Sequence, residues 1–409
     1  MHIHSPKSNK MIKIAYGKAD FAEIRQNGYF YQDRTAFIQV LEEKGTHFPA
    51  FLRPRRFGKS LFISMLQCYY GREYQNQFQT LFGDLYIGKN PTPLANQFFI
   101  LRFDFSGITT NNPQAVLKAF LKQVKTGMEN FFKTYAEFFQ TVDFERIEQE
   151  DEPSNALITF FRVATFRDVF QQGKIYVMID EYDQFTNQLL SYHSRAFEKV
   201  VSEDGSVRVF YEVLKSQTSL GKVSRIYLSG IAPMTLDSMG SGYNISTNIS
   251  LMWPFHGMLG FEAAEVKALL VTAGLTKGEL SKVLVDLRNW YNGYLFSDTV
   301  KKKVYNSTMV LYFVSQYIAL RDYPRTFLDP NIASDYKKIR QVFELVRRDP
   351  FTLPTFRKLI EEIFCLVIRA TICEGIPIIR VPVLTRVNRE RGSIRKVGDY
   401  RLARRRTFS

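Results

Sequence analysis

The residues Gly-Lys-Ser at positions 58–60 combine the types that bind phosphate. A short apolar run ends near Leu52, and an apolar segment long enough for a buried helix begins at Leu61. In the order strand, loop, Gly-Lys-Ser and helix, backbone N–H groups surround phosphate oxygens, the Lys reaches the terminal phosphates and the Ser hydroxyl ligates Mg²⁺. The stretch departs from the usual G-x-x-x-x-G-K-[ST] signature, because Arg53 stands where the first Gly belongs.

Two carboxylates follow a second apolar run. Residues 175–179 are apolar, and Asp180 and Glu181 come directly after them. In open parallel sheets, ligands bind beyond the carboxyl ends of the strands, so we expect Asp180 to face the same crevice as Gly-Lys-Ser. The alternative is that Asp-Glu only begins a loop.

These side chains predict a nucleotide site with Mg²⁺. Lys59 would contact the β- and γ-phosphates, and Ser60 and Asp180 would hold Mg²⁺. Glu181 is placed to act as the general base that polarises the attacking water.

Further nucleotide contacts are expected around this centre. Ser229 ends a short strand at 224–230, which we expect beside the Asp180 strand; its hydroxyl could orient the water or contact the γ-phosphate, or it could only cap the following loop. The remaining candidates come from the loop: Arg53, Arg55, Arg56, Phe57, Gly58 and Leu61. Loop arginines are often solvated, which is the alternative for all three.

The elements that must position these residues alternate between strand and helix. Between residues 48 and 230, β-rich runs are separated by helical patterns at 113–139, 155–170 and 207–220. The sequence predicts an α/β fold, a P-loop NTPase-type parallel sheet flanked by helices, in a domain at 20–255 that follows a polar leader at 1–19. Residues 143–152 are predicted to form an acidic surface turn.

A mostly helical subdomain is predicted at 256–384. Helical patterns occur at 262–273, 279–291, 307–321 and 331–348. The subdomain would end in a β-hairpin at 365–384, an arrangement that would resemble a winged helix. The basic segment 385–409 is expected to be disordered.

Composition limits the other possibilities. The 409 residues include 45% hydrophobic ones but no run of eighteen apolar residues, so no membrane span is expected. Three scattered Cys give no disulfide framework or zinc site, and the N-terminus lacks a signal-peptide pattern, which favours the cytoplasm. Five scattered His and the lack of a Gly-x-Ser-x-Gly elbow give a hydrolase triad no support.

The net charge of +15 raises the possibility of nucleic-acid binding. Residues 384–409 contain eight Arg, one Lys and two acids, a net charge of +7, which leaves +8 for the rest. Nearly half of the excess positive charge therefore lies in a terminal segment. Such a segment is more often solvated than involved in specific nucleic-acid binding.

Several motifs resemble the prokaryotic AAA-ATPase-like domain over about residues 20–340. They are Tyr31–Thr35, Arg53–Ser60, Ile179–Asp183, Leu228–Ile231, Ser241–Asn248, Trp290–Tyr294 and Leu328–Asp335. The resemblance implies an ATP-binding P-loop core of the additional-strand type with a helical extension, in which the missing first Gly is usual. It also suggests that Asp33 and neighbouring aromatics line the adenine side. Members commonly carry a domain similar to PD-(D/E)xK nucleases, which we expect to be absent here.

Three functions remain open at this point. The first is a Mg²⁺-dependent ATPase that couples turnover to an unknown protein partner or oligomer. The second is a nucleotide switch or scaffold that binds ATP but turns it over slowly. The third is a protein that associates with nucleic acid through its basic surface.

Overall fold

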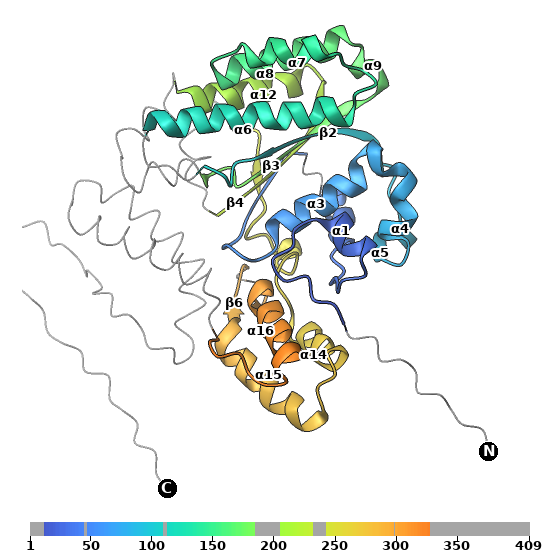
Figure 1. Cartoon of the computed structure of the whole chain (residues 1–409), viewed down its shortest axis with the longest axis vertical. Helices are drawn as coiled ribbons and strands as arrows, with labels where there is room; N and C mark the ends of the chain where they lie inside the picture. Colours follow the sequence, from blue (N-terminus) through green and yellow to red (C-terminus); the bar gives the residue numbers. More distant parts are fainter. Residues whose placement is uncertain are drawn as a thin grey trace, which may run out of the picture. The chain divides into compact units, whose positions relative to one another are not determined.

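The computed structural model describes residues 12–44, 47–108, 113–184, 205–231, 243–297 and 299–327. Within them, the central element is a five-stranded parallel sheet in the order β2-β3-β4-β1-β5 (Figure 1). Its strands are β1 (Pro49–Leu52), β2 (Phe98–Asp104), β3 (Lys174–Asp180), β4 (Val223–Gly230) and β5 (Thr247–Asn248). The predicted α/β class with a P-loop-type parallel sheet is confirmed.

The strand order brings three strand ends together. β4 lies between β1 and β3, so that Phe51 is opposite Ser229, and Ile179 is opposite Leu228. The expectation that the Ser229 strand lies beside the Asp180 strand is confirmed. Because all strands are parallel, the carboxyl ends of β1, β4 and β3 meet at one edge of the sheet.

Helices cover both faces of this sheet (Figure 1). On β3, Ile175, Val177 and Ile179 belong to the apolar cluster that includes α6 (Pro113–Thr134), α8 (Pro153–Phe166) and α12 (Ser206–Ser219), whereas Tyr176 and Met178 belong to the cluster of α3 (Lys59–Tyr70). Burial on both faces explains why the strand is apolar without alternation. The other helices of this region are α1 (Phe21–Gln26), α2 (Ala36–Glu43), η1 (Arg72–Gln77), α4 (Phe78–Phe82), α5 (Tyr86–Lys89), α7 (Thr141–Glu148) and α9 (Val169–Gln172).

The predicted surface turn at 143–152 is wrong over residues 143–148, which belong to α7. The carboxylate of Asp143 accepts a hydrogen bond from the Gln140 N–H (2.8 Å) and pairs with the Arg167 guanidinium (2.9 Å). Asp143 is therefore a buried helix-capping residue. Sequence charge alone suggested a solvated acid, because its partner is 24 residues away.

Three helices follow the sheet, as the sequence predicts: α14 (Ala263–Thr272), α15 (Lys277–Tyr291) and α16 (Ser307–Leu320). They bury a third apolar cluster. A short helix η3 (Trp253–Phe255) precedes them, and an antiparallel pair, β6 (Asn292–Tyr294) with β7 (Val304–Tyr305), separates α15 from α16. These strands are too short to give a sequence pattern. The predicted elements at 331–348, 365–384 and 385–409 lie outside the described residues. Among the described helices, none has the length and apolar character needed to cross a membrane.

Candidate functional site

The loop between β1 and α3 turns through two residues with left-handed backbone. Arg56 has φ 68°, and Gly58, the residue that precedes α3, has φ 94°. Glycine adopts this conformation without a steric penalty, which explains its place at the turn. The helix begins immediately, since the Phe62 N–H donates to the Gly58 carbonyl (3.0 Å). The loop thus leads into a helix N-terminus, whose first amides have no partner within the helix, and such a site favours anions.

A cavity of about 510 Å³ lies against this helix N-terminus. Its volume is within the range of small-molecule sites. Gly58, Lys59, Ser60 and Glu181 line it. Other parts of its wall come from residues 15–19, 30–32, 259–261 and the start of α16.

Lys59 and Glu181 face each other within the cavity. Lys59 Nζ is 3.6 Å from Glu181 Oε1, and it also donates to the backbone oxygens of Arg53 (3.1 Å) and Pro54 (3.4 Å). Glu181 has φ 52°, a left-handed conformation that a non-glycine residue rarely adopts. A cationic and an anionic side chain are therefore held together at the end of the sheet.

Asp180 lies behind this pair and is almost fully buried. Its carboxylate accepts hydrogen bonds from Ser229 Oγ (2.5 Å), from the Glu181 N–H (3.0 Å) and from the Ser60 hydroxyl. Burial raises the pKa of Asp180, although the two hydroxyl groups and Lys59 act in the opposite direction. The arrangement joins three strand ends, because these polar groups come from the phosphate loop, β3 and β4.

The oxygen donors at this point suit Mg²⁺. Mg²⁺ usually takes one or two protein oxygens and completes its shell with water and phosphate. Ser60 and Asp180 supply one hydroxyl and one carboxylate in direct contact. In the described part of the chain, no group of three or more His, Cys, Asp or Glu side chains could hold a metal alone.

The three loop arginines have different positions. Arg55 donates to Gln184 Oε1 (2.8 Å) and lines the cavity, as does the exposed Arg56. The guanidinium of Arg53 is instead buried and donates to backbone carbonyls of the protein (2.7–3.0 Å). We therefore leave its side chain out of the nucleotide contacts proposed below.

The apolar loop residues support the cavity wall. Phe57 is buried and packs edge-on against Tyr294 and Phe296, with ring centroids 4.8 and 5.4 Å away. Leu61 is half-buried and lines the cavity.

Two parts of the wall were not foreseen as site elements. Residues 15–19, which the sequence assigns to a polar leader, line the cavity. At the start of α16, Ser307 Oγ donates to the Phe57 carbonyl (2.9 Å), and the Thr308 N–H donates to the Arg56 carbonyl (3.2 Å). Asn306 caps α16 and gives a sequence signal for a helix start, but nothing in that signal indicates contact with the phosphate loop.

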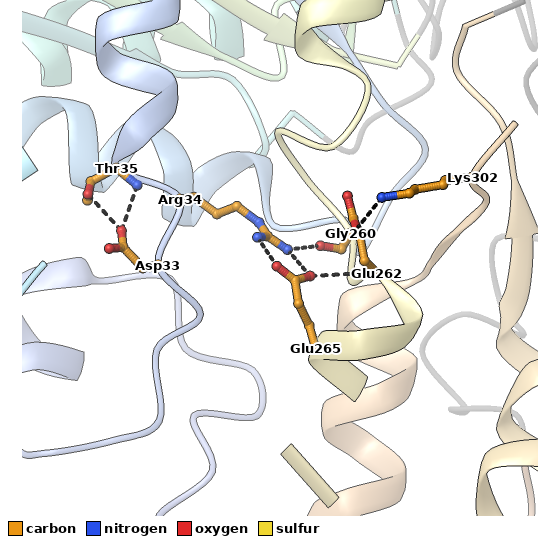
Figure 2. Close-up of polar contacts among 7 residues, drawn as sticks. All are labelled: Asp33, Arg34, Thr35, Gly260, Glu262, Glu265 and Lys302. Carbon is orange, nitrogen blue, oxygen red and sulfur yellow. Dashed lines mark hydrogen bonds and ion pairs between the residues drawn. The ribbon is translucent and has the colours of Figure 1, made fainter. Parts of the chain in front are cut away.

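A pair of charged residues joins the N-terminal part of the cavity to α14 (Figure 2). The Arg34 guanidinium donates to both carboxylate oxygens of Glu265 (2.5 and 2.6 Å) and to the Gly260 carbonyl (2.6 Å). The neighbouring Asp33, considered for the adenine side, instead accepts hydrogen bonds from Thr35 and from the Tyr86 N–H. Arg34 and Gly260 both line the cavity, so the contacts of Arg34 connect two parts of its wall.

Comparisons with known proteins agree with this arrangement. A family model described as a predicted AAA-ATPase matches residues 15–240, which include β1 to β4 and every residue of the Lys59–Asp180 centre. A curated relative, named "Uncharacterized protein in vnfD 5'region" and found in Azotobacter chroococcum mcd 1, is 28% identical over 293 residues. The match covers 69% of this chain and 48% of the relative, so the chain spans about half the length of that relative. With more than half of its residues in the matched region, the chain belongs to the predicted AAA-ATPase family.

Proposed function

We propose that this protein binds ATP with Mg²⁺ and hydrolyses it to ADP and phosphate. The observation that carries the proposal is that Lys59, Ser60 and Glu181 line one cavity of nucleotide size, with the buried Asp180 in contact with Ser60 behind them. Membership of the predicted AAA-ATPase family supports the same ligand.

Binding would use the helix N-terminus and the loop cations. The amides of residues 58–61 would receive the β-phosphate oxygens, and the Lys59 ammonium would leave its present backbone acceptors to contact the β- and γ-phosphates. Arg55 and Arg56 line the same cavity and would add positive charge near the γ-phosphate. Ser60 and Asp180 would hold Mg²⁺, which when bound neutralises charge on the phosphate oxygens.

Hydrolysis would need a group that takes a proton from water. Glu181 is the carboxylate that lines the cavity next to Asp180, and it is the residue that we assign as general base. Water attacks the γ-phosphorus, the bond to the bridging oxygen of ADP breaks, and the proton of the water goes to Glu181. Ser229 is held by Asp180 and would act through it, by fixing the carboxylate orientation.

A nucleotide switch is the second candidate, and one contact favours it. In the structure Glu181 is paired with Lys59. This ion pair engages both the proposed general base and the proposed phosphate ligand. A protein in which this pair persists would bind ATP and turn it over slowly. A phosphate-release assay separates the two candidates, because only an ATPase loses activity when Glu181 is changed.

Partners and location follow as proposals from the same function. We propose that turnover acts on a protein partner or on further copies of this chain in the cytoplasm, where ATP is available. Association with nucleic acid through residues 385–409 is not carried into this proposal, since those residues lie outside the described part of the chain.

The test is ATP binding by the full chain, measured by titration calorimetry with Mg²⁺. Lys59→Ala should bind ATP about 10- to 100-fold more weakly than the wild type, the range expected when a hydrogen-bonded charge is removed. Lys133→Ala is the matched control, because this lysine is exposed on α6 and pairs with Glu129 in the preceding turn. Equal ATP affinity for the wild type and Lys59→Ala would refute the proposal.

A further inference from the structure

Arg53 carries a charge that the fold buries almost completely. Its side chain has no exposed surface, and its guanidinium lies between the rings of Phe51 (4.2 Å) and Phe296 (3.9 Å). No carboxylate of the described residues forms an ion pair with it, and burial lowers the pKa of Arg53 to about 9. Burial of an unpaired charge is costly, so the contacts of this side chain need a reason.

The guanidinium joins the end of β1 to the segment that follows β5. Nη1 donates to the carbonyls of Leu52 (2.8 Å) and Ser250 (2.7 Å), and Nη2 donates to the carbonyl of Phe255 (3.0 Å). The Leu52 N–H also donates to Ser250 Oγ (2.8 Å). One planar group thus fixes three carbonyls that come from two separate segments.

The backbone of the same residue contacts Lys59. The Arg53 N–H donates to the Gly230 carbonyl at the end of β4 (3.1 Å), and the Arg53 carbonyl accepts from Lys59 Nζ (3.1 Å). Arg53 is not one of the left-handed residues of the loop, which are Arg56 and Gly58. Its position therefore does not require glycine, although the phosphate-loop signature has glycine there.

The stacked ring extends this support to the rest of the loop. Phe296 covers one face of the guanidinium and also packs against Phe57. Its N–H donates to Nδ1 of His256 (3.3 Å), whose Nε2 contacts the Lys302 carbonyl (2.7 Å). The start and the middle of the phosphate loop are consequently held by one aromatic side chain.

We propose that Arg53 is a positioning residue: its buried guanidinium fixes the first residue of the phosphate loop, and so directs Lys59 toward the cavity, in place of the glycine of the usual signature. This inference rests on the nucleotide site proposed above. On this inference Arg53, at the position of the first Gly of the signature, supports ligand binding without contacting the nucleotide itself.

The decisive variant is Arg53→Gly, which restores the usual signature. On this inference the restored signature binds ATP about 10- to 100-fold more weakly than the wild type, the effect of a misplaced contact group. The ATP affinity of Arg53→Lys should lie between those of the wild type and Arg53→Gly, because a single ammonium cannot reach carbonyls in two directions and stack between two rings. Arg72→Met is the control, since it removes an arginine stacked on Phe99 (4.4 Å) outside the cavity wall, and its ATP affinity should equal that of the wild type.

A purely structural role is separated by chemical rescue. Arg53→Ala leaves a slot between two rings and three carbonyls, and low millimolar guanidinium should recover ATP affinity to within a few-fold of the wild type, whereas methylammonium should not. ATP affinity is measured at a temperature well below the thermal unfolding midpoint of each protein. Under these conditions a general loss of stability leaves ATP affinity unchanged. Absence of rescue by guanidinium would count against the inference.

The outcomes divide cleanly. Wild-type ATP affinity in folded Arg53→Gly would overturn the role of Arg53 and leave the proposed function intact. No ATP binding by the wild type would overturn the proposed function and this inference with it, before any variant is compared. Should Arg53→Gly fail to fold, Phe296→Leu decides: several-fold weaker ATP binding supports the inference, and unchanged binding overturns it.

Discussion

Two buried regions of the molecule are built from opposite kinds of residue. The layer of α6, α8 and α12 packs phenylalanines against one another: Phe160 meets Phe131 edge to face (5.1 Å between ring centroids) and stacks on Phe132 (5.6 Å). The carboxyl edge of the sheet instead buries Arg53, Lys59 and Asp180 and holds left-handed backbone at residues 56, 58 and 181. The first region lowers the free energy of the fold, whereas the second accepts costly burial of charge. We therefore expect substitutions in the phenylalanine layer to change stability and substitutions at the carboxyl edge of the sheet to change activity.

The largest effect is expected at the carboxyl edge, in Glu181→Gln. Loss of the general base should lower kcat about 10²- to 10⁴-fold while ATP affinity changes little. Single-turnover phosphate release and titration calorimetry measure the two quantities. Retained turnover would assign the proton transfer to another group and would weaken the contrast between the two regions.

In the phenylalanine layer, Phe160→Ala should have the reverse signature. The ring is fully buried, and its removal should lower the free energy of unfolding by about 3–5 kcal/mol. Urea unfolding measures this loss. ATP affinity at low denaturant should be unchanged, and a parallel loss of affinity would show that the two regions are coupled.

Arg34 tests a half-buried ion pair that belongs to the cavity wall. Arg34→Met removes the hydrogen bonds to Glu265 and Gly260, and should lower the free energy of unfolding by about 1–3 kcal/mol (Figure 2). Glu265→Gln keeps the shape of the carboxylate and should lose less. An unchanged urea midpoint for Arg34→Met would mean that the ion pair contributes nothing measurable.

The smallest effect concerns pH. Burial lowers the pKa of His256, aided by Arg53, while the Lys302 carbonyl and Glu262 oppose the shift. In the unfolded chain, His256 has its ordinary pKa of 6.5 and therefore binds a proton more readily than in the folded protein. Its contribution to the free energy of unfolding is fully present above pH 6.5 and is lost as the pH falls through the lower folded pKa. Thermal unfolding at about pH 7.5, 6.5 and 5.5 should show the advantage of the wild type over His256→Gln shrinking at the lowest pH. A constant advantage would contradict this assignment.

The sequence predicted the sheet and the centre of the site because both depend on local order along the chain. Apolar runs that end in Asp180 and Ser229 identify strand ends, and parallel strands bring such ends together. The chemistry proposed for Lys59 and Glu181 follows from their residue types and from their place at that edge of the sheet. These are properties that a single strand–loop–helix unit displays.

What the sequence could not provide depends on contacts between distant segments. The cavity wall at residues 15–19 and the start of α16 carry no sequence signal for a ligand, because their place is decided by tertiary packing. For Arg53 the sequence offers a phosphate contact or, because arginine in a polar loop is usually exposed, a solvated side chain, and neither alternative indicates its burial. Its acceptors at Ser250 and Phe255 lie about 200 residues away, and no local pattern reveals them.

The hydrogen bond from the Thr308 N–H to the Arg56 carbonyl makes the start of α16 a reporter of the phosphate loop. A peptide group that rotates to present its N–H to an anion also turns its own carbonyl, and an amide proton that this carbonyl held would become free to exchange with deuterium. The exchange rate at Thr308, together with that of the neighbouring helix amides, would thus record ligand occupancy without a probe in the loop itself. A spectroscopic label on α16 could follow the same event in time, at a residue about 250 positions further along the chain.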